Sequence, residues 1–483
     1  MGGVMTEILT PDICVIGAGS GGLTVAAAAA RFGVPVVLVE KGLMGGDCLN
    51  YGCVPSKALI AAAKAAHRQR HASAFGVADV VPEIDFARVH RHVREVIDAI
   101  APADSVERFT ELGVRVVAGE ARFKDRNTVV VTSNEGGREI RARRFVVATG
   151  SSPSIPDIPG LGEAGYLTNE TVFDLARRPG HLIVVGGGPL GMELAEAHRR
   201  LGAEVTLLEA GRVLSQEDPE LAVVVREALR REGVIIHERA RVVGVERMPG
   251  DSVRVRAETE AGPLAIDGTH LLVAAGRRAN VENLGLEKAG VAFDAGGIKV
   301  DRRLRSTNRR AYAIGDVVGG PQFTHMANHH AGLVLRALLF RLPAAENRLI
   351  VPRVTYTDPE LAHIGLTEED ARKAHGSVRV LRSPYAENDR AQAERQTEGF
   401  IKLVTGRRGR ILGVSIVGAG AGEQIGFWAL ALSKKMNARD IIGHVAPYPS
   451  IGEIGKRAAL VYFSDATRSG WVRRLVGLLR RFG

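Results

Sequence analysis

Apolar runs of four or five residues recur through the first three hundred positions, and each ends at a glycine or an acidic residue. Runs of this length and composition predict buried strands. The clearest strands are predicted at 12–16, 36–40, 181–185 and 204–209. A segment with the propensity of a helix separates the first two strands, at Leu23–Phe32, and another separates the last two, at Met192–Arg200. Strands that alternate with helices predict an α/β fold built on parallel sheets.

The remaining pattern divides into a helical middle and a strand-rich end. Phe86–Leu112 has helical periodicity, and 113–123 is predicted as strands. From about residue 347 the chain has the pattern of an α+β segment. The tail, 471–483, alternates apolar residues with arginines and predicts a short cationic amphipathic helix. We expect this helix to be docked or frayed, and we do not expect it to contact a membrane.

Two glycine clusters follow predicted strands and open predicted helices. The first cluster contains Gly17, Gly19 and Gly22 and is followed by Glu40. The second has the same spacing, with Gly186, Gly188 and Gly191 followed by Glu209. In this context the first glycine makes a tight turn, the second lets the backbone approach a pyrophosphate, and the third allows close helix packing. The acid, 18 residues after the last glycine in both sites, would accept a ribose hydroxyl. The sequence therefore predicts two dinucleotide sites.

A cysteine pair, Cys48 and Cys53, lies between these sites, just before a predicted helix at 58–71. Positions i and i+5 of a regular helix are about 8–9 Å apart at Cα, whereas a disulfide needs roughly 4.4–6.8 Å. A bond between the two cysteines would therefore need a distorted backbone, which Gly52 permits. Two unpaired thiols are one interpretation. A redox pair is the other, since a helix N-terminus and Lys57 would both stabilise a thiolate.

Length and composition limit the class of protein. The chain has 483 residues, so two to four domains are expected. Only three cysteines are present, which favours a reducing compartment, and we expect a cytoplasmic protein. Cys14 is predicted to be a core residue. The net charge is +10, but the basic residues are scattered and no nucleic-acid partner is expected.

The segment Gly45–Lys57 resembles the active-site disulfide segment of the flavoprotein disulfide reductases, which include dihydrolipoamide dehydrogenase, glutathione reductase and mercuric reductase. The resemblance implies two Rossmann-like dinucleotide-binding domains, the first for FAD and the second for NAD(P)H, and a C-terminal α+β dimerisation domain. The implied boundaries are 1–150 with 277–346 for FAD, 151–276 for NAD(P)H, 347–470 for the interface and 471–483 for the tail. The FAD domain is thus expected to be discontinuous, and the protein to be a homodimer.

The resemblance also implies roles for single residues. Further FAD contacts fall at Lys57, Gly119, Thr149, Gly150, Asp316, Thr324 and His325, and a further NAD contact falls at Gly276. By position, Cys48 matches the thiol that meets the substrate and Cys53 the thiolate beside the flavin. Glu193 matches the acid that pairs with Lys57. No metal-binding site is expected.

The substrate is less defined. Family members that act on lipoamide or glutathione carry a His five residues before a Glu, and here Tyr448 precedes Glu453. Tyr448 is a poor base at neutral pH but can donate a proton. Tyrosine at this position resembles mercuric reductase, although no cysteine follows Cys53. The expected activity is electron transfer from NAD(P)H through FAD and Cys48–Cys53 to a disulfide, a metal ion or a quinone-like acceptor.

A dihydrolipoamide dehydrogenase proper is the alternative, and a non-catalytic flavin-binding protein is a third possibility. For the electron donor, Glu209 would repel a 2′-phosphate, so NADH is favoured over NADPH even though Arg212 lies nearby in the sequence.

Overall fold

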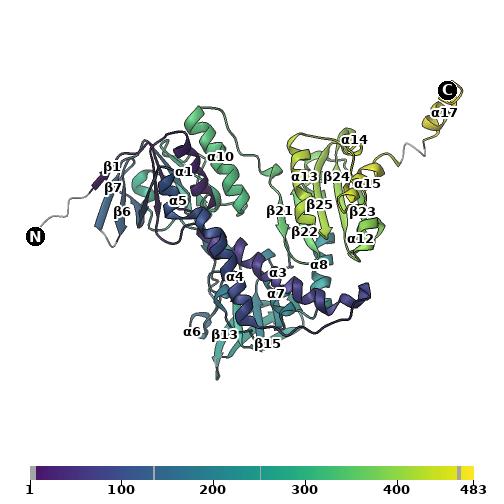
Figure 1. The fold of residues 1–483 in the computed structure, drawn as a ribbon, viewed down its shortest axis with the longest axis horizontal. Coiled ribbons are helices and arrows are strands. Elements are labelled where there is room, and N and C mark those ends of the chain that lie inside the picture. The colour runs from purple at the N-terminus through teal and green to yellow at the C-terminus, as the bar shows by residue number, and fades with distance from the viewer. Residues whose placement is uncertain (1–6, 134–135, 251, 465–468, 483) are drawn as a thin grey trace, which may run out of the picture.

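The computed structural model describes residues 7–133, 136–250, 252–464 and 469–482. Figure 1 shows three units: one at the left that holds the N-terminal strands, one below it, and one at the right that holds the C-terminal sheet. The helix at the C-terminal end, α17 (Gly470–Leu479), stands beyond the right-hand unit.

The first unit is built on a five-stranded parallel sheet. In spatial order its strands are β20 (Ala311–Ala313), β8 (Arg144–Val147), β2 (Ile13–Ile16), β3 (Val36–Glu40) and β4 (Val114–Ala118). On one face, α1 (Ser20–Arg31) and α10 (Thr324–Phe340) pack against the buried side chains of Val15 and Leu38. Cys14 points into the other face and is fully buried, so the prediction of a core residue is confirmed.

A second, smaller sheet completes this unit. Its strands are β1 (Glu7–Leu9), β7 (Gly136–Ile140), β6 (Val129–Ser133) and β5 (Glu120–Phe123), and nearby lie α9 (Leu286–Ala289), β18 (Phe293–Asp294) and β19 (Gly297–Ile298). Because β20 pairs with β8, the chain returns to the first sheet after it has built the second unit.

The second unit repeats the strand-turn-helix arrangement. Its parallel sheet has the order β12 (Ile235–Glu238), β11 (Glu204–Glu209), β10 (His181–Val185) and β16 (His270–Val273), and its helices are α6 (Leu161–Ala164), α7 (Pro189–Arg200) and α8 (Pro219–Arg231). An antiparallel sheet of β13 (Arg241–Met248), β14 (Ser252–Thr259) and β15 (Gly262–Gly268) lies beside it. The chain enters through β9 (Ser151–Pro153) and leaves through β17 (Arg277–Ala279), and these two strands pair with each other.

The third unit has one antiparallel sheet covered by helices. The strand order is β21 (Arg353–Thr355), β22 (Glu360–Gly365), β25 (Ile411–Gly418), β24 (Phe400–Thr405) and β23 (Arg379–Pro384). The helices are α11 (Glu368–His375), α12 (Asp389–Ala393), α13 (Ala421–Ser433), α14 (Ala438–Gly443) and α15 (Glu453–Val461). Trp428 on α13 fills the centre of this core.

The helices that carry the cysteines connect the units. A short α2 (Gly46–Asn50) precedes the long α3 (Cys53–Arg70), which runs from the first unit toward the third across the second, and α4 (Phe86–Ile100) packs along it. The helix predicted over Phe86–Leu112 is interrupted after α4 by a 3₁₀ turn at Ala101–Asp104, which has Pro102 near its start, and the chain then enters α5 (Val106–Glu111).

Candidate active site

The two cysteines lie on either side of a break between two helices. Cys48 is in α2 and Cys53 is the first residue of α3. Gly52, between them, has φ −125° and ψ −109°, and a side chain there would contact the carboxylate of Asp47. The backbone is therefore distorted at Gly52, as a bond between the two cysteines would require. Both cysteines are free thiols in the structure, and the Cys48 thiol donates a hydrogen bond to the sulfur of Cys53.

The surroundings separate the acidities of the two thiols. The pKa of Cys53 is lowered to about 6, mainly by the hydrogen bond from Cys48, with further help from the Thr324 hydroxyl and the charge of Lys57. Burial and Asp47 act in the opposite direction. The same hydrogen bond, together with burial, raises the pKa of Cys48. Near neutral pH the pair therefore holds one thiolate, on Cys53.

Lys57, one turn after Cys53, forms an ion pair that joins two units. Its Nζ donates to Glu193 Oε2 on α7 over 2.8 Å and lies 4.5 Å from the ring centroid of Tyr356. The side chain of Glu193 is 4% exposed, whereas that of Lys57 is 37% exposed. The other oxygen of Glu193 accepts from the backbone N–H of Tyr356 over 2.9 Å. The pair thus fixes α7 and the segment before β22 around the lysine.

The first glycine turn borders a large cavity. Gly17 has φ +104°, and a side chain there would collide with the carbonyl of Ala148. A side chain at Gly22 would meet the carbonyl of Gly17, whereas Gly19 faces open space. Glu40 accepts from the N–H groups of Ala18 over 2.5 Å and Gly42 over 2.7 Å. The cavity has a volume of about 690 Å³ and is lined by Gly17, Gly19 and Glu40 together with Cys48, Cys53 and Lys57.

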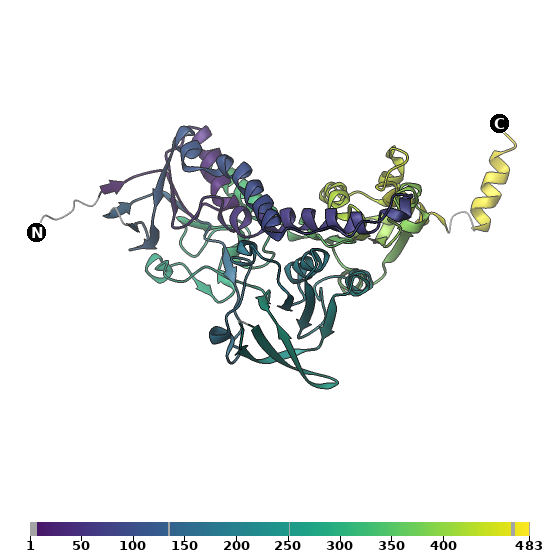
Figure 2. The same ribbon diagram turned by 60° about the horizontal axis from the view of Figure 1, so that its bottom comes forward.

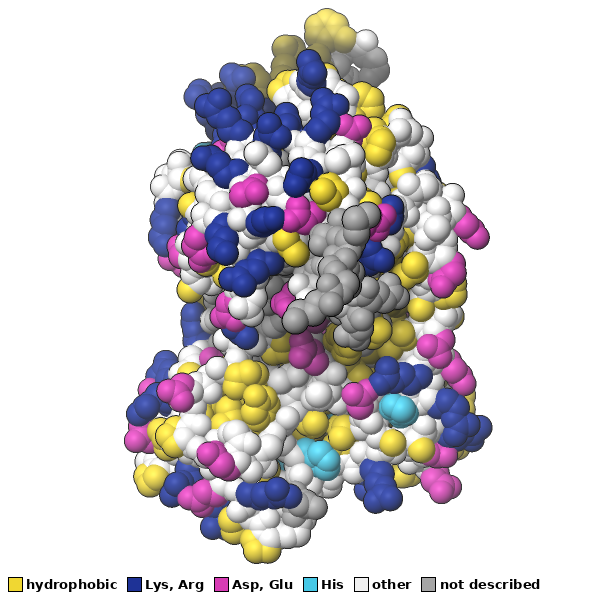
Figure 3. All heavy atoms as spheres, turned by 90° about the vertical axis from the view of Figure 1, so that its left-hand side faces the viewer, with side chains coloured by type: hydrophobic (Ala, Val, Ile, Leu, Met, Phe, Trp, Pro, Cys, Tyr) yellow, Lys and Arg dark blue, Asp and Glu magenta, His cyan; other side chains and the backbone are white. Residues whose placement is uncertain are grey.

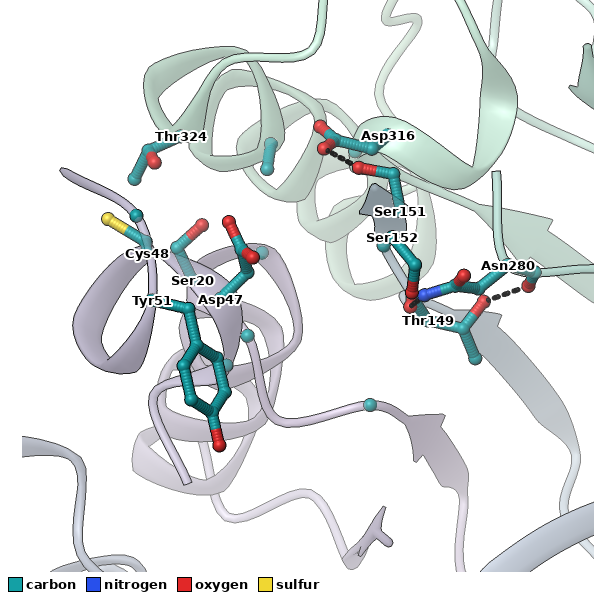
Figure 4. A pocket seen from close by; sticks show the side chains of 18 of the residues that line it. Ser20, Asp47, Cys48, Tyr51, Thr149, Ser151, Ser152, Asn280, Asp316 and Thr324 are labelled. Atoms are coloured by element: carbon teal, nitrogen blue, oxygen red, sulfur yellow. Dashed lines mark hydrogen bonds between the residues drawn. The ribbon is translucent and has the colours of Figure 1, made fainter. Parts of the chain in front are cut away.

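A polar network on the far side of the cavity carries Asp316. Ser151 donates to the carboxylate of Asp316 over 2.6 Å, and Arg277 donates to the Ser151 hydroxyl over 2.7 Å. Arg277 also pairs with Asp47 at 3.0 Å. Burial raises the pKa of Asp316. Figure 4 shows the contact between Ser151 and Asp316 on one side of the cavity, with Cys48 and Thr324 on the other.

The other residues with predicted FAD contacts also line the cavity. Thr149 donates to the carbonyl of Asn280 over 2.8 Å, which is the second dashed contact of Figure 4. The Thr324 hydroxyl lies 3.5 Å from the sulfur of Cys53, at the start of α10. His325 donates from Nε2 to the carbonyl of Pro352 over 2.7 Å, so its side chain anchors the linker to the third unit. Gly119 and Gly150 also line the cavity.

The residues present fit a flavin dinucleotide. An open backbone at Gly19, an acid at the end of β3 and a half-buried acid at 316 together provide a turn for a pyrophosphate and two hydroxyl acceptors. The same cavity brings the thiolate of Cys53 and the ammonium of Lys57 to one end.

The second glycine turn has the same geometry as the first. Gly186 has φ +114°, and a side chain there would meet the carbonyl of Ala274. Gly191 packs against Gly186, whereas Gly188 faces open space. Glu209 accepts from the N–H groups of Gly187 and Gly211, each over 2.7 Å. The other predicted contact, Gly276, accepts a backbone hydrogen bond from Ser154 and directly precedes Arg277.

Tyr448 and Glu453 are not brought to the cavity by this chain. The side chain of Tyr448 is 70% exposed, and its hydroxyl donates to Asp389 over 2.9 Å. Glu453 opens α15 in the third unit and lies 3.7 Å from Arg457. Across the described ranges, no group of three or more His, Cys, Asp or Glu side chains is arranged to hold a metal ion. In the same ranges no helix is long and apolar enough to cross a bilayer.

Sequence reasoning missed several residues of this site. Arg277, Ser151 and Asn280 form the polar wall of the cavity, and Tyr356 covers Lys57. The paired crossing strands β9 and β17 bring the first three together. A signal was present for Arg277, because it directly follows the strand and glycine that end the second unit.

Comparisons with known proteins agree with this geometry. The profile of the pyridine nucleotide-disulphide oxidoreductases matches residues 11–331, and the profile of their dimerisation domain matches 351–459. A mercuric reductase of Streptomyces lividans is 35% identical over 95% of this chain and 97% of its own length. A dihydrolipoyl dehydrogenase of Geobacillus stearothermophilus is also 35% identical, over 93% of this chain and 96% of its own length.

Solved structures have the same architecture. The HOCl-induced flavoprotein disulfide reductase RclA from Escherichia coli, as its Cu(II) complex, superposes with a TM-score of 0.83 at 28% identity, over 94% of this chain and 99% of its own. LpdA from Mycobacterium tuberculosis superposes with a TM-score of 0.85 at 27% identity, over the same shares of the two chains. These relatives are enzymes that use FAD and NAD(P)H. The chain belongs to the class I pyridine nucleotide-disulfide oxidoreductases and is an FAD-dependent enzyme with the α/β fold of that family.

Proposed function

We propose that this enzyme passes electrons from NADH, by way of FAD, to the Cys48–Cys53 pair and from there to an external acceptor. The acceptor is a disulfide, a metal ion or a quinone-like compound. The observation that carries the proposal is the thiolate of Cys53, whose pKa is lowered to about 6 at the start of α3, facing the cavity beside Lys57. A structural thiol buried in apolar surroundings would have a raised pKa instead, as Cys14 does.

Bound FAD would supply a carrier that takes a hydride from the nicotinamide and hands an electron pair to the cysteines. Glu40 and Asp316 would hold its hydroxyl groups, and Gly19 its pyrophosphate. Lys57 would keep a positive charge at the end of the cavity nearest Cys53, where Glu193 holds the ammonium in position. Thr149, Gly150, Gly119 and the start of α10 at Thr324 and His325 would enclose the remainder.

The thiols themselves would exchange with the acceptor. For a disulfide acceptor, the sulfur of Cys48 attacks one acceptor sulfur and expels the other as a thiolate, which takes up a proton. The thiolate of Cys53 then attacks Cys48, releases the second acceptor thiol and restores the Cys48–Cys53 disulfide. Because its pKa is raised, Cys48 must give its proton to a base before it attacks.

The groups that manage these protons would come from a second subunit. Tyr448 and Glu453 lie on the third unit, away from the cavity of their own chain. We propose a homodimer in which Tyr448 of the partner subunit donates a proton to the leaving thiolate. Glu453 would orient that residue. The match to a dimerisation profile over 351–459 supports this arrangement.

NADH is the proposed electron donor. Glu209 closes the second glycine turn as Glu40 closes the first, and its carboxylate would accept from a ribose 2′-hydroxyl and repel a 2′-phosphate. Arg212 is exposed three residues later and would attract a phosphate in part. The preference for NADH is therefore expected to be moderate rather than absolute.

The acceptor can be identified by anaerobic NADH oxidation with the purified holoenzyme. Hg(II), oxidised lipoamide and a water-soluble quinone would be tested side by side, each with the Cys53→Ser variant as the control. Turnover of lipoamide would favour a dihydrolipoamide dehydrogenase, and turnover of Hg(II) alone would favour metal reduction. Turnover that is equal in the Cys53→Ser variant for every acceptor would overturn the proposed route through the cysteines.

A further inference from the structure

The terminal helix α17 presents an apolar face that no other part of the described chain covers. None of its residues is buried, although most are large and hydrophobic. Trp471 is 71% exposed, Phe482, just beyond the helix, is 80% exposed, and the leucines between them are also exposed. The sequence predicted a docked or frayed helix, and the structure shows α17 beyond the third unit with none of its residues buried (Figure 2). Within the described chain, the apolar side chains of α17 are therefore exposed to solvent.

The residues of α17 are sorted by chemistry onto two faces. Trp471, Val472, Leu475, Val476 and Leu479 recur at spacings of one, three and four positions, so they occupy one side of the helix. Arg473 and Arg474 lie on the other side of the helix, and Arg480 and Arg481 follow directly after its last residue. No acidic residue occurs between Ser469 and Phe482. The face of the molecule seen in Figure 3 carries both Lys and Arg and Asp and Glu side chains, and its hydrophobic side chains form small groups.

A helix of this length is not expected to be stable in water by itself. Isolated helices shorter than about 12–15 residues are marginal even with favourable sequences, and α17 has 10 residues. Its apolar face therefore needs a surface that covers it and supports the helical conformation.

The charge of the helix selects that surface. The chain as a whole carries a net charge of +10, so another copy of it offers little electrostatic attraction to a cluster of arginines. An anionic lipid surface offers both the negative charge for the arginines and an apolar layer for tryptophan, leucine and phenylalanine. A tryptophan at one end of the apolar face also suits the boundary between head groups and acyl chains.

We propose that α17 binds the enzyme to the surface of an anionic lipid bilayer, with the helix axis in the plane of the membrane. The apolar face enters the upper part of the acyl layer, and the arginines lie at the phosphate groups. This attachment is peripheral, and it does not depend on which acceptor the active site reduces.

Flotation of the holoenzyme with lipid vesicles tests the proposal. One set of vesicles would be phosphatidylcholine alone, and the other phosphatidylcholine with about 30% phosphatidylglycerol. We expect flotation with the anionic vesicles only, and release in high salt because the attraction is screened. Reversal of two charges, Arg480→Glu with Arg481→Glu, should weaken the partition by more than about tenfold. The same change at the exposed pair Arg302 and Arg303 in the first unit is the matched control and should leave flotation intact.

A second variant tests whether binding depends on the arrangement of apolar and charged residues around the helix or only on its net charge. Exchange of neighbouring residues, Arg474→Leu with Leu475→Arg, keeps composition and net charge but places an arginine on the apolar face. We expect this exchange to weaken flotation at least several-fold. Equal flotation of the exchanged and native proteins would show that scattered positive charge, rather than the amphipathic helix, binds the vesicles, and it would overturn the proposal.

Tryptophan fluorescence gives an independent readout. The chain has two tryptophans, and Trp428 is 2% exposed, so a response to vesicles should come from Trp471. We expect a blue shift of the emission with anionic vesicles and its loss in the Trp471→Phe variant. An unchanged spectrum, or no flotation with either kind of vesicle, would mean that another protein surface covers α17 and would contradict the proposal. Since neither measurement uses turnover, failure of the proposed electron transfer would not affect either result.

Discussion

The hydrogen bond from Cys48 to Cys53 predicts different behaviour for two variants that both lack the Cys48 sulfur. Cys48→Ser keeps a hydroxyl donor at this position, whereas Cys48→Ala removes the donor. That donor is the largest cause of the lowered pKa of Cys53. Because neither variant can form the disulfide, Cys53 is a free thiol in both without added reductant.

The size of the effect follows from the strength of a hydrogen bond to a charged group. Such bonds contribute about 1.5–3 kcal/mol, and about 1.36 kcal/mol corresponds to one pKa unit. The pKa of Cys53, about 6 in the structure, should therefore stay near that value in the Ser variant and rise by about 1–2 pH units in the Ala variant. At pH 7 the thiolate fraction would fall from about nine-tenths to between about a half and a tenth.

The rate of alkylation by iodoacetamide as a function of pH measures this directly. Only Cys14 and Cys53 remain in these variants, and burial raises the pKa of Cys14 to about 12, so the rate near neutral pH reports Cys53. Peptide mass spectrometry would confirm the labelled site. Identical midpoints in the Ala and Ser variants, or a Ser midpoint near that of a free thiol, would refute the reasoning.

Three further predictions concern the groups around the pair. Glu193→Gln should lower the free energy of unfolding of the holoenzyme, measured in urea, by about 2 kcal/mol, because Lys57 loses the negative charge that neutralises it. The loss is moderate because Lys57 is partly exposed to water, although Glu193 is nearly buried. An unchanged free energy of unfolding would mean that the ion pair does not stabilise the fold. Glu209→Gln should raise the ratio of kcat/KM for NADPH over NADH by about tenfold, since the repulsive carboxylate is removed; an unchanged ratio would leave the donor preference without this cause. Tyr448→Phe should lower turnover with the acceptor more than flavin reduction by NADH, and equal effects on both half-reactions would exclude Tyr448 from the proton transfer.

Much of the fold could be predicted from the sequence, because strands and glycine turns depend on residues that are close together in the chain. The strands predicted at 36–40, 181–185 and 204–209 have the same bounds in the structure. The glycine turns were also predictable, because a tight turn, an open backbone and a close helix each require glycine at a fixed spacing. The interruption of the helix at Pro102 was visible in the sequence, but periodicity on both sides of the proline concealed it.

Contacts between distant segments were not predictable in the same way. The hydroxyl of Thr324 reaches the sulfur of Cys53 across 271 positions, and no spacing rule connects two residues so far apart. Arg277 approaches Asp47 only because the strands that enter and leave the second unit pair with each other. The proposed role of Tyr448 depends on a second subunit, because its hydroxyl contacts Asp389 of its own chain rather than the cavity.

The helix α7 explains how one chain can serve two dinucleotides and a thiol pair. The turn before α7, at Gly186 and Gly188, is the proposed second dinucleotide site, while Leu190 and Glu193 on the helix line the cavity proposed for FAD. Glu193 also holds Lys57, which is one turn from Cys53 on α3. A nicotinamide bound over the start of α7 would therefore reach the cavity from that side. The thiolate of Cys53 reaches the same cavity from the start of α3. Because the ion pair of Lys57 and Glu193 fixes these two helix ends relative to each other, its loss should disturb both the entry and the exit of electrons, and not stability alone.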